Sequence, residues 1–264
     1  MEYTYRKEER LSKEAVYVAF PLALPGARVL SDAQLGWVDW MRDSLPGACK
    51  EWLPLQTGIL LDGEAADVFI ASPDVPLFCV GDIVRGTWPK EKDLTGGRIF
   101  SYVLNNYWHT NYRASQGGEI SFRYRLTSDR VIAQDRAYRL GWEARRPLYG
   151  HRISFQDFRR PSVPYTDVAG GTLARIEPET VALTTMKKAR WADGFVLRLQ
   201  EIAGQAETVR IEFPGTRIVG AWECDLLERD GAALEVGPDG GLAVHVPGHT
   251  LKTIRVVVDR DRSS

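Results

Sequence analysis

Short runs of alternating or β-branched residues dominate this sequence and constrain its fold more than any other feature. A strand places successive side chains on opposite faces of a sheet, so a period of two indicates half-buried strands. Turn residues separate the runs, for example Gly-Gly at 117–118 and Pro-Asp-Gly at 238–240. The sequence therefore predicts an all-β protein built as sandwiches. The main runs are 14–20, 66–71, 98–108, 119–126, 194–202, 208–213, 241–246 and 251–258.

Helical periodicity has one weak candidate, the segment SDAQLGWVDWMRDSL at residues 31–45. Gly36 within this segment argues against a continuous helix. A compositional change follows at residues 144–172, where Pro, Arg and Gly are frequent and alternation is lost. We therefore predict a first domain at 1–150, a linker at 151–172 and a second domain at 173–264.

The charge balance argues against binding to nucleic acid or to an anionic membrane. The chain of 264 residues carries 34 Lys and Arg against 35 Asp and Glu, a formal net charge of −1. It has no apolar stretch of about 20 residues, and its N-terminal sequence lacks the layout of a signal peptide. The three cysteines show no zinc or redox spacing. We therefore expect a soluble, cytoplasmic protein.

Residues 99–126 predict a β-hairpin with two different faces. The even-numbered residues of 99–112 and of 119–126 are mostly aromatic or aliphatic, whereas many odd-numbered ones are polar. The loop RASQGG at 113–118 supplies the Gly residues that a hairpin turn requires. With matched faces, Trp108 is expected in the core beside the second strand.

The polar face of this predicted hairpin has two interpretations. It is either a solvated or domain-contacting surface, as on many sheets, or a surface whose amides and guanidinium bind sugar hydroxyls. The pattern alone favours the structural interpretation and leaves the second open. The candidate carbohydrate-facing residues are Asn105, Tyr107, His109, Asn111 and Arg123.

A set of ordered motifs over most of residues 13–258 adds a family resemblance. FSYVLNNYWHTNYRASQGGEISFRYRLTS at 100–128 resembles the C-terminal β-rich region of glycoside hydrolase family 38, the α-mannosidases. The other matching motifs are KEAVYVAFPLALPG at 13–26, ASPDVPLFCVGDI at 71–83, LTTMKKARWADGFVLRLQEIAG at 183–204, AWECDLLER at 221–229 and VPGHTLKTIRV at 246–256.

The resemblance implies part of a galactose-mutarotase-like supersandwich followed by a smaller β-sandwich. Family members are much longer, and the zinc ligands and the aspartate nucleophile of the family belong to a catalytic domain upstream of this β region. None of those residues maps onto this sequence. The resemblance therefore implies a chain without a cofactor of its own, with zinc expected only in the catalytic domain.

The residues give little independent indication of catalysis. His245 and His249 are separated by Pro247-Gly248, so a turn is expected there rather than a helical zinc pair. No GxSxG motif occurs. The carboxylates that a retaining glycosidase would need close together are scattered in sequence and are expected to form turns or solvated charges. These carboxylates are Asp67, Asp74, Asp82 and Glu119.

In the second domain, alternation places Phe195, Leu197 and Leu199 on one face, and Leu242, Val244 and Val246 inward with His245 outward. Arg198 and Glu228 are expected to pair or to brace a domain interface, as the resemblance also implies.

The expected role is that of a non-catalytic β region, which supports or lines the carbohydrate site of an α-mannosidase-type catalytic domain supplied elsewhere. Two alternatives stay open: a stand-alone carbohydrate-binding module, and a structural or oligomerisation remnant without ligand. The expected partners are a mannose-containing glycan and either a catalytic subunit or a second copy of the chain. Exposed sheet edges in a partial supersandwich favour some such partner.

Overall fold

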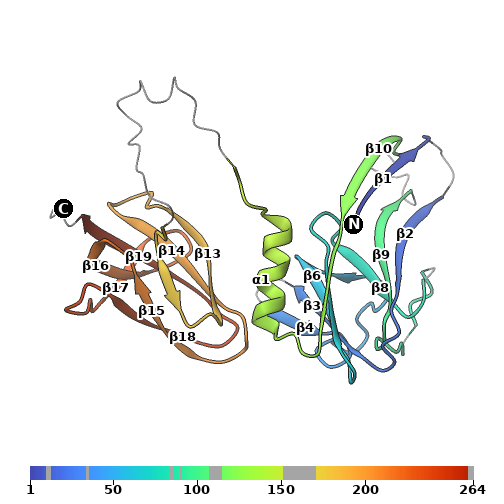
Figure 1. Ribbon diagram of the computed structural model, residues 1–264, viewed down its shortest axis with the longest axis horizontal. Helices are drawn as coiled ribbons and strands as arrows, with labels where there is room; N and C mark the ends of the chain where they lie inside the picture. Colours follow the sequence, from blue (N-terminus) through green and yellow to red (C-terminus); the bar gives the residue numbers. More distant parts are fainter. Residues whose placement is uncertain are drawn as a thin grey trace. The chain divides into compact units, whose positions relative to one another are not determined.

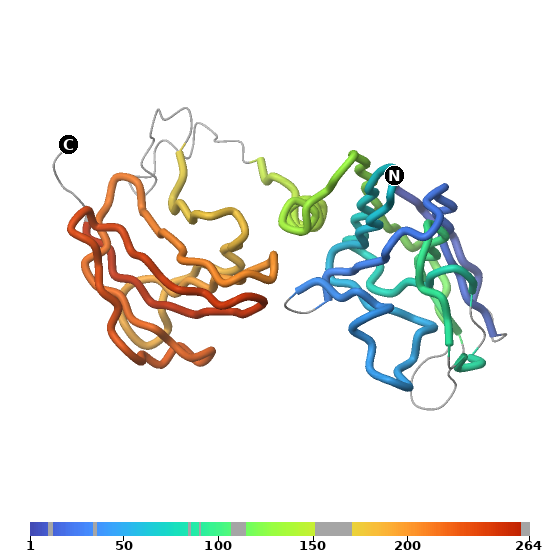
Figure 2. Tube along the Cα trace, turned by 90° about the horizontal axis from the view of Figure 1, so that it is seen from below, coloured from blue at the N-terminus to red at the C-terminus, as the bar shows by residue number. Residues whose placement is uncertain are grey.

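The computed structural model of the protein describes residues 1–9, 13–33, 36–83, 86–89, 91–106, 115–150 and 171–260. The chain divides into two compact units, Met1–Pro147 and Leu148–Ser264 (Figures 1 and 2). Antiparallel strands dominate both units, which confirms the predicted all-β class. Nearly all of the predicted linker, 151–170, lies outside the described residues, so its position stays a prediction.

Unit 1 contains two larger sheets and a two-stranded ribbon. The five-stranded sheet has the order β11-β7-β6-β3-β4, the four-stranded sheet β2-β9-β8-β5, and the ribbon pairs β1 with β10. The strands of unit 1 are β1 (Glu2–Lys7), β2 (Ala15–Pro21), β3 (Arg28–Ala33), β4 (Gly36–Asp39), β5 (Leu53–Pro54), β6 (Gly58–Asp62), β7 (Asp67–Ala71), β8 (Leu77–Val80), β9 (Arg98–Asn105), β10 (Gly118–Arg123) and β11 (Arg125–Asp129).

The core of unit 1 lies between the sheets, because alternate residues of each strand point inward. Ile59 and Leu61 of β6, Phe78 of β8 and Ile99 of β9 belong to one buried apolar cluster. Phe122 of β10 joins the same cluster, so the ribbon also closes over it. Burial of this apolar surface is the main stabilising term of a sandwich.

The second face of the five-stranded sheet is covered by the helix α1 (Gln134–Arg145), which packs against β6 and β7. Its buried residues are small or aromatic: Ala137, Tyr138, Gly141 and Ala144. A Cβ atom at Gly141 would overlap the side chain of Thr57 and approach Phe69. The helix therefore lies unusually close to the sheet, and glycine allows that approach.

The sequence prediction missed this helix and placed its one weak helical candidate elsewhere. Residues 31–45 contain the end of β3, the strand β4 and turns, so the helical candidate was wrong. The buried face of α1 is built mainly from Gly and Ala beside one aromatic residue, so it lacks the row of large apolar side chains from which a sequence pattern indicates a helix.

The predicted hairpin of residues 99–126 is described only in part. Strand β9 pairs with β2 on one side and, at residues 99–101, with β8 on the other, and β10 pairs with β1 at the start of the chain. The residues predicted to oppose 119–123 lie mainly at 107–112, outside the described residues, so that pairing stays a prediction. Alternation predicts which face of a strand is buried but carries little information about the partner strand.

The predicted faces are correct for β10 and reversed in part for β9. Phe122 is buried, and Ile120 packs against the core, whereas Glu119, Ser121 and Arg123 are exposed. On β9 the odd-numbered residues Ile99 and Ser101 point into the core. The even-numbered Tyr102 faces the other way and stacks on Tyr17 and Trp52. The predicted core residue Trp108 lies outside the described residues.

Unit 2 is a smaller sandwich of a five-stranded sheet, β13-β14-β19-β16-β17, and a three-stranded sheet, β12-β15-β18. Its buried apolar cluster draws side chains from both sheets. Its strands, which can be followed in yellow to red in Figure 2, are β12 (Arg175–Glu177), β13 (Val181–Lys188), β14 (Phe195–Glu201), β15 (Glu207–Glu212), β16 (Thr216–Cys224), β17 (Asp230–Leu234), β18 (Leu242–Val246) and β19 (Leu251–Arg260).

The alternation predicted for unit 2 is confirmed. Leu197 and Leu199 of β14 are fully buried in the cluster, and Phe195 packs against it. The apolar residues of β18 (Leu242, Val244, Val246) are buried, while His245 is exposed.

Candidate functional site

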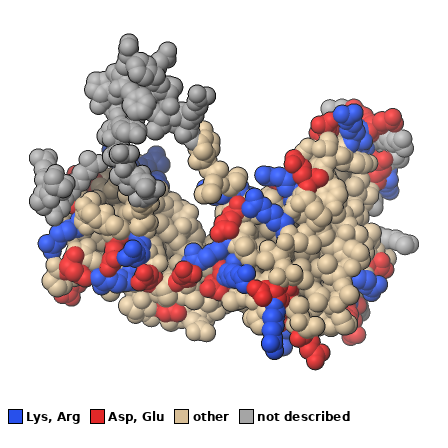
Figure 3. Space-filling view, viewed as in Figure 1, with Lys and Arg blue, Asp and Glu red and all other residues tan. Residues whose placement is uncertain are grey.

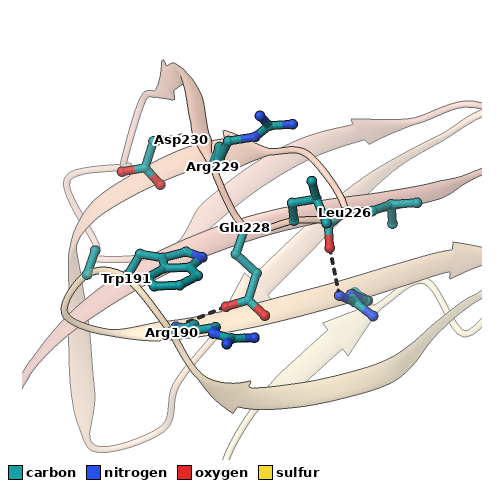
Figure 4. A pocket seen from close by; sticks show the side chains of 9 residues that line it. Arg190, Trp191, Leu226, Glu228, Arg229 and Asp230 are labelled. Atoms are coloured by element: carbon teal, nitrogen blue, oxygen red, sulfur yellow. Dashed lines mark hydrogen bonds between the residues drawn. The ribbon is translucent and has the colours of Figure 1, made fainter.

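Unit 2 has a cleft of about 770 Å³, which lies where two turns of the five-stranded sheet meet (Figure 4). One turn, residues 189–194, joins β13 to β14, and the other, residues 225–229, joins β16 to β17. The residues that line the cleft are Arg190, Trp191, Ala192, Arg198, Leu226, Leu227, Glu228, Arg229 and Asp230.

The turn at 225–229 is shaped by Asp225. Its carboxylate accepts hydrogen bonds from the backbone N–H groups of Leu227 (2.9 Å) and Arg229 (3.0 Å) and from the guanidinium of Arg229 (2.7 Å). These bonds, the backbone N–H of Arg229 first among them, hold the pKa of Asp225 below its usual value. An Asx-type turn of this kind fixes the chain locally. As a result, Leu226 and Leu227 are held at the surface, 61% and 65% exposed.

Glu228 joins the two turns. Its carboxylate accepts hydrogen bonds from the ammonium of Lys187 and from the backbone N–H of Arg190 (2.9 Å). Figure 4 shows the side chain turned from its own turn toward the loop that carries Arg190 and Trp191. The bond from Lys187 is the main reason that the pKa of Glu228 lies below its usual value. Glu228 also has a left-handed backbone, with φ of 67°, which non-glycine residues rarely adopt.

Arg198 also contacts the turn at 225–229. From β14, its Nη2 donates a hydrogen bond to the carbonyl of Leu226 (3.2 Å). Its Nε is buried and has no acceptor among the described residues. Arg198 and Glu228 therefore form hydrogen bonds with other partners rather than with each other. Arg198 donates to the carbonyl of Leu226, and Glu228 accepts from Lys187 and from the backbone of Arg190.

Asp230, which lines the cleft, belongs to a tightly bonded cluster around Arg255 of β19. Its guanidinium makes two hydrogen bonds to Asp230 (2.9 and 2.6 Å) and stacks on Trp222 at 3.9 Å from the ring centre. This pairing holds the pKa of Asp230 below its usual value. Burial and the neighbouring Asp230 raise the pKa of Cys224 to about 11, so its thiol stays protonated and unreactive near neutral pH.

Trp191 gives the cleft its most prominent apolar surface. Its side chain is 69% exposed, and the guanidinium of Arg190 lies 4.7 Å from the ring centre, within cation–π distance. Together Trp191, Leu226 and Leu227 form an exposed apolar surface, which we call the Trp191 platform. Large exposed apolar groups that cluster in this way mark interaction sites.

The residues predicted to face carbohydrate are only partly described. Tyr107, His109 and Asn111 lie outside the described residues. Asn105 is exposed at the end of β9, and Arg123 is exposed on β10, in a different sheet. The guanidinium of Arg123 makes two 3.0 Å hydrogen bonds to Asp74, and this pairing holds the pKa of Asp74 below its usual value. The carbohydrate role of these five residues stays a prediction.

The scattered carboxylates have structural partners. Besides Asp74, Asp67 accepts the backbone N–H of Ile132 (2.7 Å), which ties β7 to the segment before α1. Glu119 pairs with Arg6 across the β1–β10 ribbon (3.1 Å), and Asp82 accepts the backbone N–H of Ile83 (2.8 Å).

The sequence pattern did not indicate Trp191, Leu226 and Leu227 as a site. One signal was present, because two leucines and a tryptophan occur in turn segments, WADG and DLLER, where polar residues are usual. What was not visible is that these two segments, more than 30 residues apart in sequence, meet in space.

The two histidines 245 and 249 do not form a pair in a helix. His245 is exposed on β18, and His249 lies in the turn that follows, where its backbone N–H donates to Glu201 (2.9 Å). The predicted turn is therefore confirmed. Among the residues that the structure describes, no cluster of three or more His, Cys, Asp or Glu side chains is arranged to hold a metal ion.

The surface shows charges of both signs. On the face drawn in Figure 3, Lys and Arg are interspersed with Asp and Glu over both units, so this face presents no large area of a single sign. Within the described part of the chain, no helix has the length and apolarity needed to cross a bilayer.

Comparison with known proteins matches part of the second unit to a protein family. Residues 180–254 match the family model described as "Glycosyl hydrolases family 38 C-terminal beta sandwich domain". This range contains the whole lining of the Trp191 cleft. No curated protein sequence matches the chain.

Two solved structures share the fold of the chain as a whole. One is an α-mannosidase from Enterococcus faecalis V583, with a TM-score of 0.62 and 15% identity over 91% of this chain. The other is a glycosyl hydrolase family 38 protein from Enterococcus faecalis, with a TM-score of 0.64 and 15% identity over the same share. The chain spans about a quarter of the length of these proteins, 25% and 26%. Residues 180–254 are therefore a glycoside hydrolase family 38 C-terminal β-sandwich domain, in a chain that has the fold of the matching region of these family 38 structures.

Proposed function

We propose that this chain is a non-catalytic β region that supports, or lines the carbohydrate site of, an α-mannosidase-type catalytic domain supplied elsewhere. The observation that carries the proposal is the position of the Trp191 cleft inside the family 38 C-terminal domain. The matched structures, which are about four times as long as the matched region, provide a second reason to expect a further body beside this chain.

The chemistry of the described residues supports a supporting role better than a catalytic one. Glycoside hydrolysis requires two carboxyl groups that flank the scissile bond and are free to exchange protons. At the cleft, Glu228 and Asp230 are each committed to cations and have pKa values below the usual range, so both are poor proton donors at neutral pH. The chemistry therefore has to come from the catalytic domain, and zinc, which the family uses, belongs with that domain in this proposal.

The test is a reconstitution with a family 38 catalytic domain encoded in the same genome. Co-expressed with that domain, this chain is expected to co-purify in a fixed ratio and to increase hydrolysis of an aryl α-mannoside. Purified alone, with zinc added, it is expected to release no product. Hydrolysis by the chain alone, or a catalytic domain that neither binds it nor responds to it, would contradict the proposal.

A second candidate function is a stand-alone carbohydrate-binding module, which the exposed ring of Trp191 favours. Calorimetric titration with mannose-containing oligosaccharides tests it. Binding that is lost in Trp191→Ala and kept in Trp88→Ala would support this candidate, because Trp88 is similarly exposed, at 64%, in unit 1. The same titration with Asn105→Ala and His109→Ala tests the separate surface predicted from the sequence.

The proposal is compatible with a cytoplasmic location and with partners that are protein or glycan rather than nucleic acid. The mixed charges of the surface in Figure 3 support the second point. Fractionation of the producing cells tests the location directly.

A further inference from the structure

We infer that the Trp191 platform is a protein-docking surface, and that its occupant is an acidic, apolar-centred surface of the catalytic domain. The inference rests on the proposed function for the identity of the partner. It adds the place of contact, the kind of surface that fits it, and the choice of protein over sugar at this cleft.

The first observation is the concentration of exposed apolar groups. Among the described residues of unit 2, the large apolar side chains that are strongly exposed include Trp191, Leu226 and Leu227, and all three line one cleft. The remaining ones, Leu148, Tyr149, Leu173 and Val219, are not in its lining. A single exposed leucine is ordinary, whereas a group of three around one hollow indicates an interface.

The second observation is that the platform is rigid before anything binds. Asp225 fixes the turn that carries the two leucines, and Arg198 holds the carbonyl of Leu226. Glu228 ties this turn to Arg190, the neighbour of Trp191. Side chains that are already ordered lose little entropy on association, so such contacts contribute more of their energy to affinity.

The third observation is the charge that the cleft leaves unbalanced. Glu228 is paired with Lys187, Asp230 with Arg255, and Asp225 with Arg229. Arg198 holds a neutral carbonyl, and its charge also helps to lower the pKa of Glu228. Arg190 has no carboxylate within ion-pair distance among the described residues and stacks on Trp191. The surface complementary to the platform therefore carries carboxylates near an apolar centre.

The same contacts make a sugar a poor occupant. Sugar hydroxyls need acceptors as well as donors, but the carboxylates of the cleft are already engaged by cations and backbone N–H groups. Arg190 covers one face of the Trp191 ring, and the two leucine side chains offer no hydrogen bonds. Trp and Arg are, by contrast, the residues most enriched at the energetic centres of protein interfaces.

The test measures binding of the full chain to the catalytic domain of the reconstitution experiment, by surface plasmon resonance. Trp191→Ala and the double variant Leu226→Ala, Leu227→Ala are each expected to raise Kd about 30-fold or more, as is typical of an interface centre. Arg190→Glu is expected to slow association most strongly at low salt. Trp88→Ala serves as the matched control and is expected to leave Kd unchanged; circular dichroism and thermal unfolding verify that each variant is folded.

The outcomes separate the inference from the proposed function. If the catalytic domain binds the wild-type chain and Trp191→Ala binds equally well, the docking surface is elsewhere, and the accessory role stands. If the catalytic domain does not bind the wild-type chain at all, both are overturned. If a mannose oligosaccharide binds at the cleft, is lost in Trp191→Ala and does not compete with the catalytic domain, the cleft is a sugar site and the docking inference is overturned.

Discussion

The strand-joining carboxylate Asp32 and the carboxylates of the Trp191 cleft work in opposite ways. In unit 1, Asp32 of β3 is 2% exposed and has no cation among its hydrogen-bond partners; its oxygens accept the backbone N–H groups of Gln56, Thr57 and Gly58 and the hydroxyl of Thr57. At the cleft in unit 2, Asp225 and Asp230 lie at the surface, Glu228 is largely buried between the two turns, and each of the three is paired with a cation. The first arrangement joins strands inside a core, whereas the second shapes turns that present apolar side chains to the outside.

The difference has a physical basis in solvation. A buried carboxylate is costly unless several donors replace its water, so Asp32 collects four. A surface carboxylate keeps much of its water, so each ion pair contributes little stability and mainly fixes geometry. Variants at the two kinds of site should therefore have very different effects.

The largest effect is expected from Asp32→Ala. The change leaves the backbone N–H groups of Thr57 and Gly58 and the hydroxyl of Thr57 without their acceptor, whereas the N–H of Gln56 keeps the backbone carbonyl of residue 32. We expect this to lower the free energy of unfolding by about 3–5 kcal/mol. Chemical denaturation followed by tryptophan fluorescence measures it. Asp225→Ala, which removes a surface carboxylate, is the comparison variant. An equal decrease in the free energy of unfolding in both variants would show that the surface carboxylate contributes as much as the buried one.

Gly141→Ala in α1 is expected to lower the free energy of unfolding by a smaller amount, about 1–3 kcal/mol. The added methyl group overlaps Thr57 and approaches Phe69, so the helix has to move away from the sheet that Asp32 helps to hold. Glu143→Ala, at an exposed position of the same helix, is the matched control and is expected to change stability by less than about 0.5 kcal/mol. Equal thermal midpoints for the two variants would show that the close approach of the helix is not important.

The pH dependence of stability should have opposite signs in the two units. Burial, the largest influence, raises the pKa of Asp32 above its ordinary value of 3.8. A raised pKa means that the stabilising contribution of Asp32 is fully present below 3.8 and is lost as pH rises through the raised value. The pKa of Asp230 is lowered by Arg255, so its contribution is present above 3.8 and is lost as pH falls through the lowered value.

Denaturation midpoints measured between about pH 3 and pH 7 check this contrast. Asp32→Asn is expected to flatten the decline of stability with rising pH, and Asp230→Asn to flatten the loss at low pH. Identical pH profiles for the wild-type chain and Asp32→Asn would rule out the raised pKa.

The smallest effect on stability, and a diagnostic one, is expected at Glu228. Glu228→Gly removes the carboxylate but suits the left-handed backbone, whereas Glu228→Ala removes the carboxylate and keeps the unfavourable φ of 67°. We expect Glu228→Gly to be the more stable of the two and both to loosen the loop of Trp191, seen as a change in tryptophan emission. Emission identical to that of the wild-type chain in both variants would indicate that Glu228 does not position the platform.

The sequence predicted much of the fold and little of the site. Alternation correctly assigned the buried faces of β10, β14 and β18, because a period of two in a half-buried strand is a local property. It was reversed in part at β9, where Ile99 and Ser101 point into the core and the aromatic residues Phe100 and Tyr102 lie on the opposite face. It also missed α1, whose contact with the sheet depends on Gly141 and other small residues rather than on a large apolar stripe.

By itself the sequence determined the all-β class, the inward and outward sides of most strands, and the likeness to the family 38 C-terminal region, because each depends on residues near one another in the chain. Only the tertiary structure decided which strands pair and where a cleft forms. The hydrogen bonds of Glu228 reach residues 41 and 38 positions away. Contacts across such separations depend on how the whole sandwich folds, so no local pattern could have placed Trp191 beside Leu226 and Leu227.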